Sequence, residues 1–125
     1  YDEKYNELKN KISQPEIHYF VKTIQTSPSI FNTLKDMVQK SDVPDNFLYL
    51  AMIESKFLTS AKSNKNAAGL WQLMPKTAKL LKLKRNRYVD ERLDPIKSTK
   101  AAIEYIKYLH KRFKKWYLAA LAYNC

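Results

Sequence analysis

Residues 44–56 read PDNFLYLAMIESK, and the seven residues from Phe47 to Ile53 are all apolar. Pro44 opens this segment, which is expected to be helical from Asp45 to about Lys56. Such a helix would be apolar on every face, and helices of that kind lie at the centre of a fold. The stretch therefore predicts a buried central helix on which the other elements pack.

Composition favours a helical fold for the whole chain. The 125 residues include one glycine and one cysteine, and 45% of them are hydrophobic, which is enough to cover a core. A β-rich fold is disfavoured because hairpin turns and bulges need glycine. A single cysteine excludes a disulfide framework. We therefore expect a compact, single-domain, all-α protein.

Two amphipathic helices are predicted before the central segment. Apolar residues recur at helical spacing over residues 17–24 and again over 30–38, where Ser27 and Pro28 suit a helix cap and first turn. Residues 1–42 carry no recognisable motif, and we expect them to form an N-terminal helical segment packed on the core. Residues 43–125 are expected to form that core, within one structural domain.

Three helices are predicted after the central segment. Pro75 starts a short basic helix that runs to about Leu83, after a loop of small and polar residues from Thr59 to Gly69. Asp94 and Pro95 cap the longest helix, which runs to about Phe113, and a last apolar helix starts near Trp116. The inward face of the longest helix is expected to consist of Ile96, Ala102, Ile103, Ile106, Leu109 and Phe113.

Glu54 is the first candidate for chemistry, because it ends the most apolar segment of the chain. Burial and a helix C-terminus both favour the protonated form of a carboxyl group, as a general acid requires. The alternative interpretation is that Glu54 emerges from the core and pairs with one of the many lysines. Both interpretations remain open at this point.

A second carboxylate is missing nearby, since residues 55–89 contain nine Lys or Arg but no Asp or Glu. Glycosidases commonly place two carboxylates across the scissile bond. A second one would have to come from a more distant residue such as Asp90, Glu91 or Asp94. The same stretch is also consistent with nothing more than a basic surface.

The lone glycine lies in residues 67–75, which read AAGLWQLMP. We expect Gly69 to adopt a positive φ or to sit where another group approaches its backbone closely. Gln72 is an amide beside the aromatic Trp71, an arrangement that suits recognition of a sugar or a base. The alternative is a loop that folds its apolar residues back onto the core.

The formal net charge of +11 favours an acidic partner, whether nucleic acid, anionic lipid or an acidic polymer. No apolar run approaches the roughly 20 residues that span a bilayer. His18 and His110 lack metal-ligand spacing, and Cys125 is a poor nucleophile candidate at the end of the chain. We expect no metal and no cofactor.

Three segments taken together resemble the ordered motifs of the soluble-lytic-transglycosylase family. They are residues 54–57 (ESKF), 69–75 (GLWQLMP) and 122–124 (AYN), and residues 90–102 also resemble that family's lead into its long helix. The similarity covers about residues 43–125. The GLWQ sequence and the YNC ending are most similar to a membrane-bound subgroup of that family.

The resemblance implies a lysozyme-like helical fold and cleavage of the β-1,4 bond between N-acetylmuramic acid and N-acetylglucosamine in peptidoglycan, with a 1,6-anhydro product. It implies that Glu54 is the single catalytic acid and base, and that the substrate's N-acetyl group supplies the help of a second carboxylate. Ser55 and Gly69 are expected to support the site. The substrate contacts implied in the same way are Ser63, Gln72, Met74, Tyr123 and Asn124.

Two alternatives stay open: an inactive or truncated peptidoglycan-binding module of the same fold, and a basic helical domain that binds nucleic acid. The presence of Glu54 speaks against the first, and the second lacks a recognition-helix or stacking motif. We expect a monomer that binds glycan strands rather than nucleic acid, in the periplasm or cell envelope of a bacterium. The chain begins without methionine and ends within an apolar run, which indicates a fragment of a longer protein.

Overall fold

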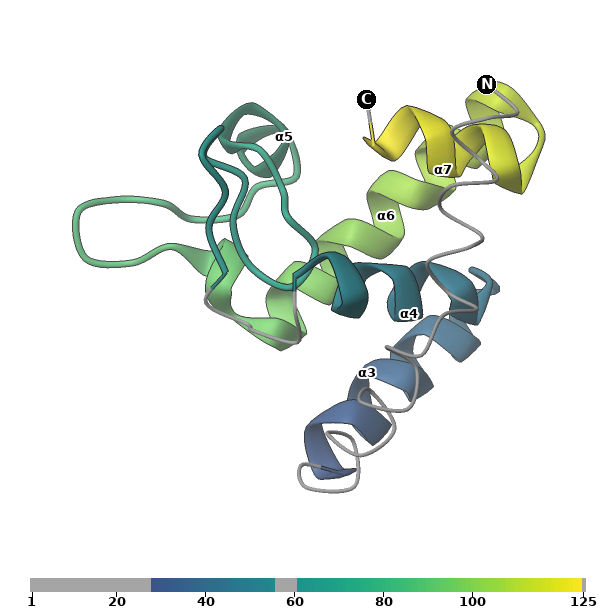
Figure 1. Ribbon diagram of the computed structural model, residues 1–125, viewed down its shortest axis with the longest axis horizontal. Coiled ribbons are helices and arrows are strands. Elements are labelled where there is room, and N and C mark those ends of the chain that lie inside the picture. Colours follow the sequence, from purple (N-terminus) through teal and green to yellow (C-terminus); the bar gives the residue numbers. More distant parts are fainter. Residues whose placement is uncertain (1–27, 56–60, 125) are drawn as a thin grey trace.

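The computed structural model describes residues 28–55 and 61–124, and Figure 1 shows their arrangement. The elements are α3 (Pro28–Lys40), α4 (Asp45–Glu54), α5 (Pro75–Leu80), the 3₁₀ turn η1 (Glu91–Leu93), α6 (Pro95–Phe113) and α7 (Trp116–Asn124). Within these ranges the only β-type pairing consists of isolated bridges between loop residues. The prediction of an all-α fold is confirmed, while the helix predicted over residues 17–24 lies outside the described residues.

The main core lies where α3, α4 and α6 meet. Leu34 and Val38 of α3, Leu48 of α4 and Ile106 of α6 are almost completely buried there. Leu70, Trp71 and Leu73 join the same core from the loop that precedes α5. This loop is therefore anchored by its own apolar side chains.

Helix α4 is central, but the prediction that it would be buried on every face is wrong. Leu48 and Leu50 are buried, whereas Phe47, Ala51 and Met52 are only half-buried. Phe47 and Ala51 lie on a side of the helix that opens onto a pocket, which they line together with the buried Leu50. The apolar residues on that side form part of a concave surface.

Helix α6 begins and ends as predicted. The Asp94 carboxylate accepts hydrogen bonds from the backbone N–H groups of Ile96 and Lys97, as an N-cap residue should. Ala102, Ile103, Ile106 and Leu109 are buried, but Ile96 and Phe113 are exposed, contrary to the prediction. Both lie at the ends of a 19-residue helix, beyond the part that the core covers.

Helix α5 ends at Leu80, three residues before the predicted end. Lys82 adopts a left-handed conformation with a φ of 63°, and the N–H groups of Lys82 and Leu83 donate to the carbonyls of Lys79 and Ala78. This is the Schellman pattern, in which a residue other than glycine takes the left-handed position. Residues 84–90 then form a hairpin that projects at the left of Figure 1.

No helix in the described ranges is both long enough and apolar enough to cross a membrane. Helix α7 is apolar but short, and it packs against α6. Its Ala119 and Leu121 are buried. The apolar character of the last segment therefore serves packing between helices.

Candidate active site

A small pocket brings together three of the residues singled out in the sequence, Glu54, Gln72 and Tyr123. Its volume is about 50 Å³, which is room for one or two water molecules. The walls come from α4, α6, α7 and the loop before α5. The lining residues are Phe47, Leu50, Ala51, Glu54, Leu70, Trp71, Gln72, Ile106 and Tyr123.

Glu54 is the last residue of α4, and its side chain is exposed at the pocket. The predicted burial is therefore wrong, because the helix ends where its last side chain leaves the core. The next residue, Ser55, is buried, and its N–H donates to the carbonyl of Ala51 while its hydroxyl donates to that of Met52. Ser55 thus fixes the end of the helix from which Glu54 projects.

Gly69 has a φ of 82°, as the sequence predicted for the lone glycine. A β-carbon there would overlap the carbonyl oxygen of Arg92, so the predicted close approach to its backbone is also present. The N–H of Gly69 donates to the carbonyl of Ala61, and its own carbonyl accepts from the N–H of Gln72. The glycine therefore allows a tight loop that lies against the turn η1.

The side-chain amide of Gln72 is oriented by this loop. Its Nε2 donates to the carbonyl oxygens of Gly69, at 2.8 Å, and Ala61, at 3.2 Å. Carbonyl oxygens only accept hydrogen bonds, so the amide atom that contacts both of them must be the nitrogen Nε2. The oxygen Oε1 is therefore the other terminal atom of the amide. No described residue donates a hydrogen bond to Oε1, which leaves an acceptor at the pocket.

Trp71 and Tyr123 tie the loop to α6 and α7. The Trp71 indole N–H donates to the Thr99 hydroxyl at 2.8 Å, between two buried side chains. The Tyr123 hydroxyl donates to the Trp71 carbonyl at 2.7 Å. Burial, with a smaller contribution from Tyr105, raises the pKa of Tyr123 well above its ordinary value, so the phenol stays protonated.

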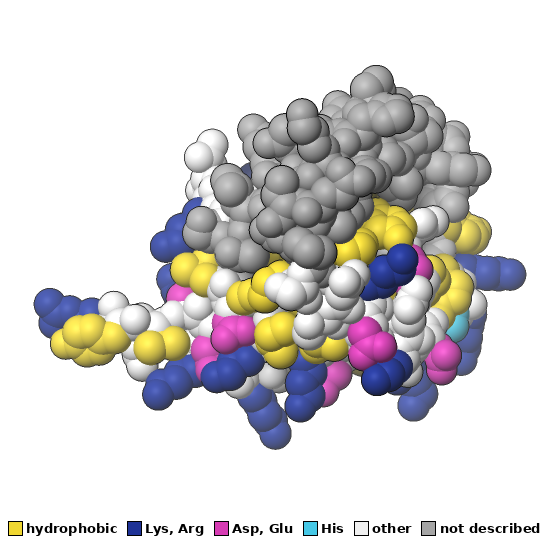
Figure 2. Space-filling model, turned by 90° about the horizontal axis from the view of Figure 1, so that it is seen from below, with side chains coloured by type: hydrophobic (Ala, Val, Ile, Leu, Met, Phe, Trp, Pro, Cys, Tyr) yellow, Lys and Arg dark blue, Asp and Glu magenta, His cyan; other side chains and the backbone are white. Residues whose placement is uncertain are grey.

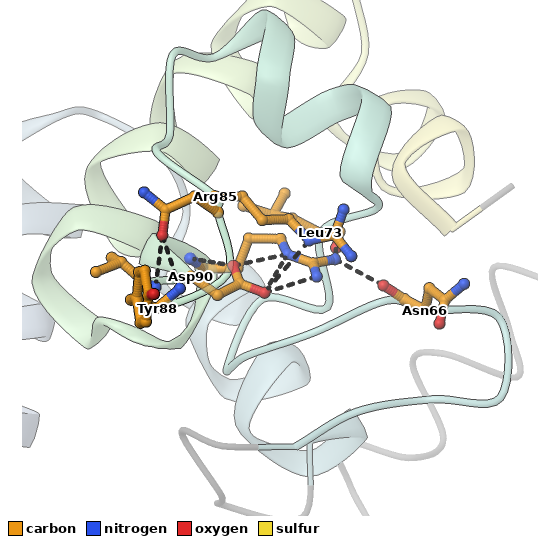
Figure 3. A network of polar contacts seen from close by, with 8 residues as sticks. Asn66, Leu73, Arg85, Tyr88 and Asp90 are labelled. Carbon is orange, nitrogen blue, oxygen red and sulfur yellow. Dashed lines mark hydrogen bonds and ion pairs between the residues drawn. The ribbon is translucent and has the colours of Figure 1, made fainter.

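Arg92 is the residue of this site that the sequence analysis missed. Its side chain is 3% exposed, and its guanidinium contacts the Asp90 carboxylate through Nε and Nη2 (Figure 3). Its Nη1 donates to the carbonyls of Asn66, at 2.6 Å, and Leu73, at 2.8 Å. Arg92 therefore holds both ends of the loop that carries Trp71 and Gln72 to the pocket.

The three acids proposed as a possible second carboxylate all have structural partners. Asp90 binds Arg92 and lies 3.7 Å from Arg85, Glu91 pairs with Lys97, and Asp94 caps α6. Hydrogen bonds from Arg92 hold the pKa of Asp90 below its usual value. None of the three lines the pocket, where Glu54 is the one carboxylate among the described residues.

Two of the remaining predicted contacts, Ser63 and Met74, do not line this pocket. Ser63 is exposed, and its hydroxyl oxygen accepts from the N–H groups of Lys65 and Ala67, which shapes a local turn. Met74 is exposed at the start of α5. Asn124 is the last residue of α7, and its side chain lies outside the description, as does Cys125. Their roles stay predictions.

The two histidines lack metal-ligand spacing in the sequence. His110 stacks on Trp116 with ring centroids 3.6 Å apart, while His18 lies outside the described residues. Among the residues that the structure describes, no group of three His, Cys, Asp or Glu side chains is placed to hold a metal ion.

Comparison with known proteins gives a consistent set of similarities. The transglycosylase SLT domain matches residues 31–125. A protein of Alteromonas sp. (strain M-1) named for tributyltin chloride resistance is 40% identical over 106 residues, which cover 84% of this chain and 51% of that protein. The membrane-bound lytic murein transglycosylase D of Escherichia coli K12 is 32% identical over 124 residues, which cover 98% of this chain and 27% of that enzyme. The chain thus spans about half or less of the length of these curated relatives.

Proposed function

Because the chain belongs to the transglycosylase SLT domain family, we propose that it is part of a peptidoglycan lytic transglycosylase that acts in the bacterial cell envelope. The family has a lysozyme-like helical fold, in agreement with the helices described above. We further propose that residues 28–124 work as one unit, because α3 shares its core with α4 and α6. The substrate proposed is the glycan strand of peptidoglycan.

The observation that carries this proposal is the meeting of Glu54, Gln72 and Tyr123 in one pocket. These residues belong to three separate motifs of the family and come from α4, a loop and α7. A single carboxylate beside an amide acceptor and a fixed phenol suits acid–base chemistry on a sugar. The pocket is too small for a sugar ring, so the glycan would lie across its mouth and cover Glu54.

The proposed reaction uses Glu54 first as an acid and then as a base. Its carboxyl group donates a proton to the glycosidic oxygen as the bond from that oxygen to muramoyl C1 breaks. The resulting carboxylate then takes the proton of the muramoyl C6 hydroxyl while O6 bonds to C1, which closes the 1,6-anhydro ring. The substrate's own N-acetyl oxygen stabilises C1 between these steps, so a second carboxylate is not needed.

The neighbours of Glu54 have separate proposed roles. Oε1 of Gln72 accepts a hydrogen bond from the substrate, while its Nε2 holds the loop. The neutral Tyr123 supports the same wall of the pocket through the Trp71 carbonyl. Ser63, Met74 and Asn124 are proposed as substrate contacts on the strength of the family motifs alone. Glu54 is exposed before binding, so the glycan that lies across the pocket would itself exclude water from the carboxyl group.

The test of this function is mass spectrometry of the products released from purified sacculi. Anhydro-muropeptides would support the proposed reaction. Muropeptides with a reducing end would instead identify a hydrolase that adds water. If nothing is released although sacculi are bound, the chain is a binding module and the proposed activity is wrong.

A further inference from the structure

A second groove lies beside α5 and shares no lining residue with the pocket of Glu54. Its volume is about 390 Å³, within the range of sites that hold small ligands. Pro75, Ala78 and Leu83 give it an apolar side, and Lys76, Lys79 and Arg85 give it three positive charges. We call these six residues the basic groove.

The charges of the basic groove are available to a ligand. Among the described residues, no carboxylate forms an ion pair with Lys76 or Lys79, whereas Lys40 pairs with Asp36 and Lys97 with Glu91. Arg85 lies 3.7 Å from Asp90, a carboxylate that Arg92 already holds through several hydrogen bonds. Three positive charges therefore share a concave surface where few carboxylates of the protein neutralise them, and this favours an anionic partner.

The basic groove is also adjacent in the chain to the proposed active site. Pro75 starts α5 only three residues after Gln72. The segment that joins them is held by the hydrogen bond from the Arg92 guanidinium to the carbonyl of Leu73. Residues 55–89 contain no acidic residue, so no carboxylate of that stretch opposes binding of an anion. A ligand with both a sugar and an acidic branch matches this pair of sites.

We propose that the basic groove binds the stem peptides of peptidoglycan through their carboxylates. This inference rests on the proposed function, because that substrate carries acidic peptides on the muramoyl sugar whose glycosidic bond Glu54 would help to break. Lys76 and Lys79 would bind carboxylates, and the half-buried Pro75 and Leu83 would contact the small side chains of the peptide. The groove would thereby give the enzyme a preference for glycan strands that carry peptides.

The first test measures binding without turnover. A soluble stem peptide, released from sacculi by an amidase, is titrated against the protein and against the double variant Lys76→Gln/Lys79→Gln. Loss of two exposed ion pairs should weaken binding about tenfold. The same peptide with its carboxylates amidated should bind the unchanged protein weakly as well.

The matched control is Lys107→Gln/Lys111→Gln, which removes the same charge from exposed positions on α6 that line neither cavity. It should leave the affinity for the stem peptide within about twofold of the original value. If both double variants weaken binding equally, the effect is one of net charge and the proposed site is wrong. Equal binding of the acidic and amidated peptides would overturn it too.

The second test separates this inference from the proposed function. The ratio of kcat/KM on intact sacculi to kcat/KM on strands stripped of peptides should fall about tenfold in the Lys76/Lys79 variant and stay constant in the control. An unchanged ratio in both variants would contradict the inference while leaving lytic activity established. If the protein shows no turnover at all, the proposed function fails, and the peptide titration still decides whether the groove binds stem peptides.

Discussion

Gly69 lies so close to Arg92 that a β-carbon on the glycine would overlap the arginine's carbonyl oxygen and lie 2.8 Å from its carbonyl carbon. The guanidinium of the same arginine donates to the carbonyls of Asn66 and Leu73, on either side of the glycine. Backbone and side chain of Arg92 therefore fix the loop at three points. The position of Gln72 at the pocket depends on this contact.

Gly69→Ala should destabilise the fold strongly, because the methyl group forces the two backbones apart and the φ of 82° adds strain. We expect a loss of about 2–4 kcal/mol of unfolding free energy, measured by denaturant titration. Asn66→Ala is the control, since Asn66 also has a positive φ but an exposed side chain. It should cost about 1 kcal/mol, and equal losses in the two variants would mean that contact with Arg92 is not the cause.

The Asp90–Arg92 pair should make stability depend on pH in the acid range. Hydrogen bonds from Arg92 lower the pKa of Asp90 in the folded state below its value of about 3.9 in the unfolded chain. The ionised Asp90 therefore contributes fully to the free energy of unfolding above the unfolded-state pKa, and this contribution is lost as the pH falls through the lower folded-state pKa. Asp90→Asn should cost about 3 kcal/mol at pH 7, because it leaves the buried Arg92 without its counter-ion. Thermal melts from pH 7 to pH 2.5 should show the difference in Tm shrinking below pH 4. A difference that stays constant would exclude the ion pair as its source.

The sequence could predict the helices because their signals are local. The start of α6 is marked by the adjacent residues Asp94 and Pro95. The apolar spacing that marks α3 likewise involves residues within a few turns of each other. The end of α5 was harder, because Lys82 takes a left-handed conformation that glycine would normally mark. Local rules therefore located the α-helices of the described residues, but they missed the end of α5 and the turn η1.

The site was only partly predictable because its supports are distant in the chain. Gly69 was notable as the lone glycine, yet nothing in its neighbourhood identified Arg92 as its contact. Arg92 itself was one of 23 basic residues, and its burial against Asn66 and Leu73 appears only when the loop and η1 are brought together. The burial expected for Glu54 failed because apolar neighbours along a helix do not determine where its last side chain points.

Glu54→Gln should abolish turnover while leaving the fold intact. The substitution is close to isosteric at an exposed position, but an amide cannot donate and recover a proton at neutral pH. Release of anhydro-muropeptides should fall about 10²–10⁴-fold, with an unchanged Tm and retained binding to sacculi. Glu104→Gln, at an exposed site on α6, is the control and should keep full activity. Residual turnover above about a hundredth of the original rate would remove Glu54 from the mechanism.

The net charge of +11 should make binding to sacculi sensitive to salt. Electrostatic attraction between exposed charges is screened over about 8 Å at 0.15 M ionic strength, and over shorter distances as salt rises. Cosedimentation with sacculi should therefore weaken progressively between 0.05 and about 0.5 M NaCl. If binding is unchanged across this range, uncharged contacts in the pocket account for the affinity for sacculi.

Gln72→Ala should affect stability and activity together, because the two ends of the amide have different partners. Removing Nε2 takes one hydrogen bond away from each of the carbonyls of Gly69 and Ala61, which keep their backbone donors, at a cost of about 1–2 kcal/mol for the two bonds. Removing Oε1 takes away the acceptor proposed for the substrate, so kcat/KM should fall even at a temperature where the variant is fully folded. Both quantities can be measured on one preparation, by thermal melting and by muropeptide release well below the Tm. If activity per folded molecule equals that of the unchanged protein, Gln72 only holds the loop, and the substrate contact at this position is wrong even where Glu54 passes its own test.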